Sequence, residues 1–240
     1  MKNLLIPSNL ESDTINAIKM AIQHSNGQNC TIYLALVSEI PDTDSSATFL
    51  RSMKSEMTVS QKNVLDQCRE LITISQNCTL KIHHQYGISA PLMKNLIEHL
   101  DIELTILTPS IRNTQKKIHN QFVQILSNTK CAILHLSANF KEQVLTKAMY
   151  LEQTMSRLQV EDLEDLIPTH FKFKIVSQAK IFNDQDPEEF QYLLAEAITK
   201  NNINLLIETR KPKKIKIKKQ NPSTSQSLGL PILSLYEEIA

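Results

Sequence analysis

The chain has 240 residues, of which 41% are hydrophobic and 21% charged, a composition typical of a globular protein. Its formal net charge of +1 gives no overall field that would steer it to DNA or to a membrane surface. It contains 3 glycines. So few glycines leave little room for the backbone-lined loops that hold many phosphate ligands.

The cysteines and the first residues bear on the cellular compartment. The four cysteines, Cys30, Cys68, Cys78 and Cys131, form no C-x-x-C pair, and two of them lie in apolar runs. This pattern is typical of buried thiols in a reduced compartment. The N-terminal segment lacks the apolar region of a signal peptide, and no apolar stretch reaches the roughly 18 residues of a membrane span. We expect a cytoplasmic protein without membrane contact.

Strands and helices are predicted to alternate over the first part of the chain. In the helix that begins near Asp13, Ile15, Ile18 and Ile22 recur at helical spacing. Strands are predicted at 3–7, 30–37, 79–86, 102–108 and 131–137, a loop at 41–46, and helices at 13–26, 47–76, 91–100 and 115–127. Strands that are apolar throughout and alternate with helices indicate a parallel sheet covered on both faces. Residues 1–138 are therefore predicted to form one α/β domain.

The remaining residues, 139–240, resemble a shortened second copy of the same layout. They are predicted to contain a long helix at 140–166, strands at 171–177, 203–209 and 230–236, a helix at 187–200 and a loop at 221–227. The order of strand end, turn, helix and apolar strand occurs in both parts of the chain. We interpret this as a degenerate internal repeat.

Three stretches resemble the universal stress protein family. They are NLLIPSNLESDTINAIKMAI at 3–22, the glycine at Gly87 and NTKCAILHL at 128–136. The resemblance implies a flavodoxin-like, Rossmann-like layered sheet of the adenine nucleotide α-hydrolase type, with strand order 3-2-1-4-5. It also implies a truncated second copy that lacks its first strand, first helix and second strand.

The resemblance locates the family's nucleotide-binding positions in this chain. The aspartate after the first strand falls on Asn9, and the small apolar residue at the end of the second strand falls on Val37, which matches. The last glycine of the family's loop and its serine or threonine neighbour fall on His119 and Asn120. The site that the resemblance implies has therefore changed at most positions.

The loop TPSIRNTQKKIHN at 108–120 contains none of the family's glycines. Glycine lets backbone N–H groups approach phosphate oxygens, and Pro109 also removes a donor. We expect that ordinary ATP or AMP binding has been lost and that the protein needs no cofactor. In the alternative, a divergent nucleotide or anion sensor, Arg112, Lys116, Lys117 and His119 hold an anion by side-chain charge, although such residues are usually solvated surface groups.

Motifs for catalysis and metal binding are missing from the sequence. No G-x-S-x-G, P-loop or H-E-x-x-H pattern occurs. His83 and His84 are adjacent on a predicted strand and point to opposite faces, while His99 and His135 have no partner in sequence. We expect neither an enzyme nor a metal protein. A hydrolase on the related scaffold is a third reading, from analogy of fold alone.

Two further features concern partners. The stretch 210–219 is rich in lysine, which gives residues 210–240 a net charge of +5 against −4 for the rest. It lacks aromatic residues that would stack on bases, so nucleic acid is an unlikely partner and an edge strand protected by lysines is preferred. The apolar final strands at 131–137 and 230–236 predict self-association or a protein partner, although a tandem chain could pair them internally.

Overall fold

The structure is a computed structural model that describes residues 2–40, 57–138, 144–153, 163, 167, 171–181, 187–211 and 228–237. The predicted loops at 41–46 and 221–227 lie outside these residues. So do the start of the helix predicted at 47–76 and the lysine-rich stretch beyond Lys211.

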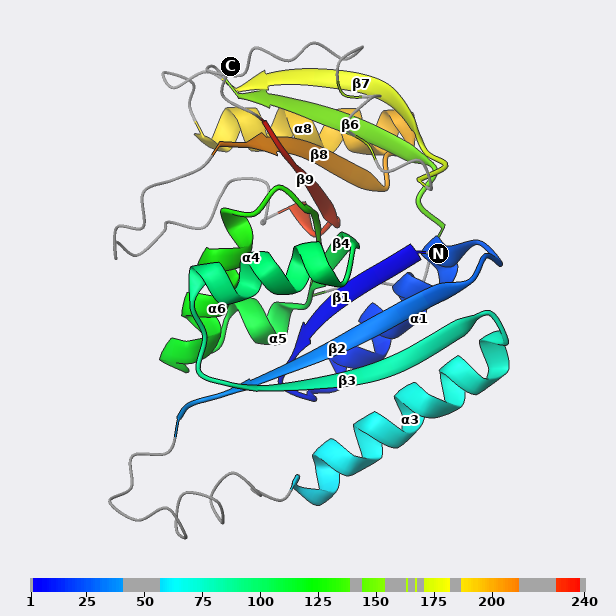
Figure 1. The fold of residues 1–240 in the computed structure, drawn as a ribbon. Coiled ribbons are helices and arrows are strands. Elements are labelled where there is room, and N and C mark those ends of the chain that lie inside the picture. The colour runs from blue at the N-terminus through cyan, green and yellow to red at the C-terminus, as the bar shows by residue number, and fades with distance from the viewer. Residues whose placement is uncertain are drawn as a thin grey trace, which may run out of the picture.

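The described residues form one nine-stranded sheet with the order β3-β2-β1-β4-β5-β9-β8-β6-β7 (Figure 1). The strands are β1 (Lys2–Ser8), β2 (Cys30–Ser38), β3 (Cys78–Tyr86), β4 (Ile102–Leu107), β5 (Ala132–His135), β6 (Lys147–Gln153), β7 (Lys174–Ile181), β8 (Leu205–Arg210) and β9 (Ile232–Tyr236). The helices are α1 (Asp13–Ser25), α3 (Val59–Ser75), α4 (Ala90–His99), α5 (Pro109–Arg112), α6 (Lys117–Ser127) and α8 (Pro187–Asn201).

The prediction of a flavodoxin-like α/β fold is confirmed. The first five strands follow the order 3-2-1-4-5, and every neighbouring pair in the sheet is parallel except β5 with β9. None of the helices in the described part of the chain is both long and apolar enough to cross a membrane.

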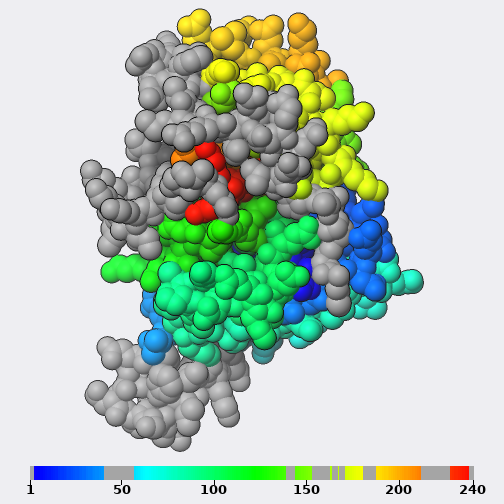
Figure 2. All heavy atoms as spheres, turned by 45° about the horizontal axis from the view of Figure 1, so that its top comes forward, coloured from blue at the N-terminus to red at the C-terminus, as the bar shows by residue number. Residues whose placement is uncertain are grey.

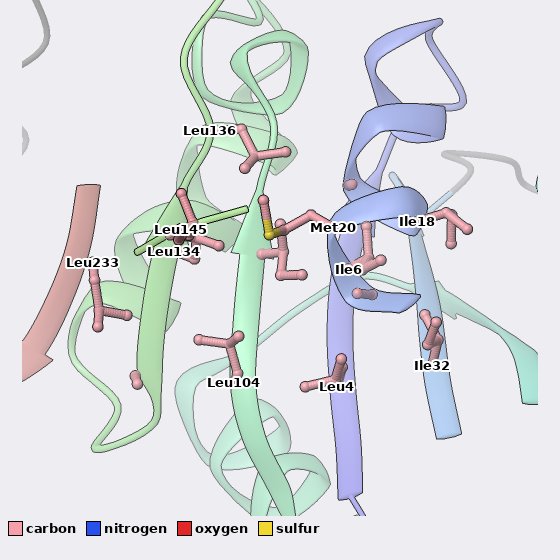
Figure 3. Close-up of a cluster of buried hydrophobic side chains, with 14 of the residues drawn as sticks. Leu4, Ile6, Ile18, Met20, Ile32, Leu104, Leu134, Leu136, Leu145 and Leu233 are labelled. Carbon is pink, nitrogen blue, oxygen red and sulfur yellow. The ribbon is translucent and has the colours of Figure 1, made fainter. Parts of the chain in front are cut away.

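Helices cover both faces of the first five strands because these strands carry apolar side chains on both faces. On one face, Leu4, Ile32 and Leu104 pack beneath α1 and α3 (Figure 3). On the other face, Leu5 and Ile133 pack against α4 and α6. These side chains are completely buried, which gives the sheet the continuous apolar strands expected of a parallel arrangement.

The long helix predicted at 140–166 is wrong over Lys147–Gln153, which forms strand β6. The sequence KAMYLEQ consists mostly of good helix formers. However, β6 lies between β7 and β8, with Ala148 and Tyr150 buried on one face and Met149 and Leu151 on the other. Burial on both faces and pairing on both edges override the local helical preference.

The two parts of the sheet meet where β5 and β9 pair antiparallel, with Leu134 opposite Leu233. Because paired residues point to the same face, the core beneath α1 continues from Leu134 across to Leu233, as Figure 3 shows. On the opposite face, Ile232 packs in the cluster beneath α8, so α8 lies on the same face as α4 and α6. The apolar final strands of the two parts therefore pair within the chain.

A single arginine spans this junction. The guanidinium of Arg210 at the end of β8 donates to the carbonyl oxygens of Thr129 at 3.0 Å and Ser127 at 3.2 Å, and also to those of Cys131 and Ser234. In the space-filling view, the red atoms of β9 lie between the green atoms of the first part and the yellow atoms of the second (Figure 2). Arg210, which the sequence placed in the lysine-rich stretch, is thus part of the packed junction.

Candidate functional site

The candidate site lies at the carboxyl ends of β1 and β2, beside the point where the strand order reverses between β1 and β4. Open α/β sheets bind ligands at this point because the connections leave in opposite directions and a crevice forms between them. A cavity of about 110 Å³ lies here. It is lined by Ser8, Asn9, Leu10, Leu36, Val37, Ser38, Met57, Gln61, His84, Lys116 and His119.

The imidazole of His119 closes one side of this cavity. It is 4% exposed, and its Nε2 lies 3.2 Å from the backbone oxygen of Val37. Burial lowers the pKa of His119 and nearby Lys116 lowers it further, while the contact with Val37 and the charge of Glu39 oppose this. A neutral imidazole that donates from Nε2 to Val37 fits this environment. Its Nδ1 has no hydrogen-bond partner among the residues that the structure describes.

Hydrogen bonds also join the start of α1 to the loop after β4. Asp13 accepts the backbone N–H of Ser110 at 2.8 Å and lies 2.7 Å from the Ser110 hydroxyl. The same hydroxyl lies 2.9 Å from the side-chain oxygen of Asn9. Because a hydroxyl has one proton, we assign it to the closer and negatively charged Asp13. The polar groups at the ends of β1 and β4 thus bind one another.

Backbone N–H groups of the loop after β4 also form hydrogen bonds within the loop itself. Its first residues form the short helix α5, in which the N–H of Arg112 donates to Thr108 and that of Asn113 to Pro109. The N–H of Lys116 donates to the Thr114 hydroxyl at 3.2 Å. The sequence analysis did not predict α5. Its turn of helix satisfies amides that a glycine-rich loop would turn towards a phosphate.

Arg112 lies outside the cavity. Its guanidinium donates to the carbonyl oxygen of Leu136 after β5, and its Nε has no partner within the described part of the chain. Burial lowers the pKa of Arg112, against the opposing charges of Asp13 and Glu208. Nearby, burial together with the charges of Arg112 and Arg210 lowers the pKa of His135 to about 3. Arg112 therefore belongs to the buried polar surroundings of the sheet junction.

The structure divides the seven predicted site residues into two groups. Asn9, Val37, Lys116 and His119 line the cavity together. The other three, Arg112, Lys117 and Asn120, do not line it, and the last two are exposed on α6.

Gln61 completes the cavity, and the sequence analysis did not identify it. Its side-chain nitrogen donates to the backbone oxygen of Asn9 at 3.2 Å, which ties α3 to the end of β1. Gln61 also forms a capping box with Thr58 at the start of α3. The pattern T-x-x-Q at 58–61 was the available signal, because such a pattern marks a helix N-terminus. In the sequence, Asp13 only marked the start of a predicted helix, and Ser110 was one residue of the loop at 108–120.

A larger cavity, of about 370 Å³, lies at the amino ends of β4 and β5. Its lining includes three carboxylates, Glu98, Asp101 and Glu103, together with Lys130 and Tyr236. None of the predicted site residues line it. It lies at the opposite ends of the strands from the candidate site. Within the described ranges, no group of three or more histidine, cysteine, aspartate or glutamate residues could hold a metal ion.

Comparison with known proteins shows similarity in structure but not in sequence. No protein-family model and no curated protein matches the chain. A universal stress protein from Archaeoglobus fulgidus DSM 4304 superposes with a TM-score of 0.59 at 9% identity, over 98% of this chain and 96% of that one. A functionally unknown protein from Pseudomonas aeruginosa PAO1 superposes with a TM-score of 0.50 at 11% identity, over 98% and 92%. At these identities the similarity establishes the fold.

Proposed function

We propose that this protein is a universal stress protein-like regulatory module that acts by binding, without catalysis, and that it no longer binds ATP in the ordinary way. The observation that carries the proposal is the 3.2 Å contact between His119 and the Val37 carbonyl. The family resemblance assigns Val37 to the nucleotide contact, and in this chain a side chain occupies that contact.

The size of the cavity supports the loss of nucleotide binding. Pockets for ligands of drug or cofactor size measure roughly 300–1,000 Å³. The cavity beside Val37 measures about 110 Å³. A nucleotide would have to displace the buried His119 from the Val37 carbonyl. This change would leave a buried polar group without its partner, at roughly 1–3 kcal/mol.

We also propose that residues 1–138 and 139–240 are two related units, the second of them truncated. The strand order β9-β8-β6-β7 corresponds to β5-β4-β1-β2 in the first unit. In this correspondence β6 takes the place of the first strand, which the sequence comparison expected to be missing. The helix α8 precedes β8 as α4 precedes β4, and both helices lie on the same face of the sheet.

A protein is the partner class that we propose. The final strands β5 and β9 have neighbours on both edges, so association through them would require two chains to exchange strands. The strands at the two ends of the sheet, β3 and β7, have one strand neighbour each. Lys174 and Lys180 are exposed along β7, and Lys172 is exposed just before it, which discourages indiscriminate pairing at that edge.

One observation favours the second candidate, a divergent nucleotide or anion sensor. Lys116 and His119 line the same cavity as Asn9 and Val37, so a cation lies beside the position of the lost phosphate loop. A small anion held by Lys116 would need less space than a nucleotide.

Thermal unfolding in the presence of ATP, ADP or AMP tests both candidates. We expect no stabilisation, whereas a ligand present at 100 times its Kd would add about 2.7 kcal/mol. Lys116→Ala and Lys117→Ala form a matched pair, because the two lysines are adjacent and only Lys116 lines the cavity. Nucleotide stabilisation that Lys116→Ala abolishes and Lys117→Ala preserves would replace the first candidate by the second.

A further inference from the structure

Two of the four cysteines lie directly opposite each other at the amino ends of neighbouring strands. Cys30 begins β2 and Cys78 begins β3, and the two residues are paired in the parallel register. The backbone N–H of Cys30 donates to the carbonyl oxygen of Asn77 at 3.0 Å, which holds the two strand starts together. This places the pair away from the cavity at the carboxyl ends of the strands.

The spacing of paired strands is compatible with a disulfide. Neighbouring strands lie about 4.8 Å apart, and disulfides join residues whose Cα atoms are about 4.4–6.8 Å apart. Both side chains belong to the same buried cluster, so they point to the same face of the sheet. The thiol of Cys78 also lies 3.6 Å from the hydroxyl of Ser25, at the end of α1. Neither cysteine is part of a disulfide in this structure.

The other two cysteines are not paired across neighbouring strands, because Cys68 lies on α3 and Cys131 just before β5. Burial raises the pKa of Cys68 and that of Cys131 to about 11. Reaction with an oxidant proceeds through the thiolate, whose fraction falls about tenfold for each unit by which the pKa rises. Cys78 lies on the edge strand β3 and is 9% exposed, whereas Cys30 is 1% exposed. An oxidant that enters at this edge of the sheet therefore meets Cys78 before Cys30.

We propose that Cys30 and Cys78 form an oxidation site, in which hydrogen peroxide converts the two thiols into a disulfide between β2 and β3. The Cys78 thiolate attacks one peroxide oxygen and gives a sulfenic acid and hydroxide. The sulfur of Cys30 then attacks the sulfenic sulfur and displaces its hydroxyl. In total, two thiols and one peroxide give one disulfide and two waters, with the sulfurs oxidised and the peroxide oxygens reduced. This step does not depend on the proposed function.

The disulfide would fix the edge of the sheet. It closes the chain from Cys30 to Cys78, which includes α3, and so restricts the unfolded state. The oxidised protein is expected to unfold at a higher temperature than the reduced one. Because α3 also carries Gln61, which binds Asn9, the same bond would steady one wall of the cavity.

Peptide mapping after peroxide treatment of the full chain tests the proposal directly. Trypsin, which cleaves after lysine and arginine, places each cysteine in its own peptide: 20–51, 63–69, 70–81 and 131–141. We expect a cross-link between peptides 20–51 and 70–81 at least about tenfold more abundant than any other, since Cys30 and Cys78 are directly opposite in register and the raised pKa values of Cys68 and Cys131 lower their own thiolate fractions. In denaturant this preference is expected to disappear.

Variants separate the reaction from effects on folding. In Cys30→Ala, dimedone is expected to trap the sulfenic acid on Cys78, while Cys68→Ala, an equally buried control, should leave the cross-link unchanged. Circular dichroism verifies that each variant is folded. A cross-link that involves Cys68 or Cys131 as often as Cys30, or Cys78 oxidised without any cross-link, would overturn the proposal. So would cysteines that remain reduced in the folded protein.

Discussion

The carboxyl ends of the first five strands, called here the carboxyl edge, and the junction between β5 and β9 satisfy their polar groups in different ways. At the carboxyl edge, side chains from several elements bind one another, as Ser110 binds Asp13, and a small cavity remains. At the junction, one side chain, Arg210, serves four backbone carbonyl oxygens. The first arrangement links the polar groups at the ends of β1 and β4, and the second joins two parts of a sheet.

Removal of a hydrogen-bond donor is expected to change stability by different amounts at these two places, because the acceptors differ in how far they can move. The carbonyl oxygens that Arg210 binds belong to the end of α6, to the turn before β5 and to β9. Their backbone stays in these elements when Arg210 is removed, so the oxygens cannot move away. The groups of the carboxyl edge can turn towards solvent or towards each other. Loss of a contact is therefore expected to cost most at the junction.

Replacement of the junction arginine should have the largest effect. Arg210→Met keeps much of the apolar stem but removes the donor that four part-buried carbonyl oxygens share, which is expected to cost about 3 kcal/mol of unfolding free energy. Urea unfolding measures this value. Arg69→Met is the matched control, because Arg69 is 57% exposed and pairs with the exposed Asp66, so it should change stability by less than about 0.5 kcal/mol. Equal effects of the two replacements would contradict the role given to Arg210.

The pH dependence of stability sharpens the description of the junction. The pKa of His135 is lowered to about 3 in the folded state, against about 6.5 when unfolded. The unfolded state therefore binds the extra proton between these values, so stability falls as the pH drops below 6.5. From pH 7 to pH 5 this group should remove about 2 kcal/mol.

His135→Gln should abolish that part of the pH dependence, since glutamine does not titrate. The exposed His99 offers the control His99→Gln, which should retain the wild-type profile. Urea unfolding at both pH values gives the comparison. If the unfolding free energy of His135→Gln changes with pH as it does in the wild type, another group controls the pH dependence. His119, whose pKa is also lowered, is then the candidate.

The contacts at the carboxyl edge can be broken with a smaller effect. Ser110→Ala removes the hydroxyl that binds Asp13 at 2.7 Å, and a hydrogen bond to a charged group contributes about 1.5–3 kcal/mol. We expect a loss near about 1.5 kcal/mol, since the backbone N–H of the same residue still binds Asp13. Thr114→Ala, in the same loop, should cost less. A larger loss for Thr114→Ala would refute the importance of the Asp13 contact.

The cap of α3 should show the smallest effect. Thr58→Ala removes the side chain that accepts the N–H of Gln61 at 3.2 Å, and losses of this kind average about 1 kcal/mol. Thr58→Ser preserves the cap and should be nearly neutral. Thermal unfolding of the two variants distinguishes the cap from the loss of a methyl group. Equal destabilisation by both would assign the effect to packing.

Much of the first unit was predictable because its signals are local. The strand predicted at 30–37 is Cys30–Ser38, and the helix predicted at 91–100 is Ala90–His99. In both cases an apolar pattern lies between residues that stop it. Of the predicted site, Val37 and His119 do meet, because Val37 lies near the end of β2 and His119 in the first turn of α6.

The sequence alone determined the alternation of strands and helices and the absence of glycine from the loop at 108–120, since both depend on neighbouring residues. Only the tertiary structure decided that Lys147–Gln153 is a strand, that β5 pairs with β9, and that His119 enters the cavity while Arg112 turns to Leu136. Each of these depends on contacts between segments far apart in the chain. Burial on both faces of a sheet and the need to pair every buried polar group are conditions that no local pattern contains.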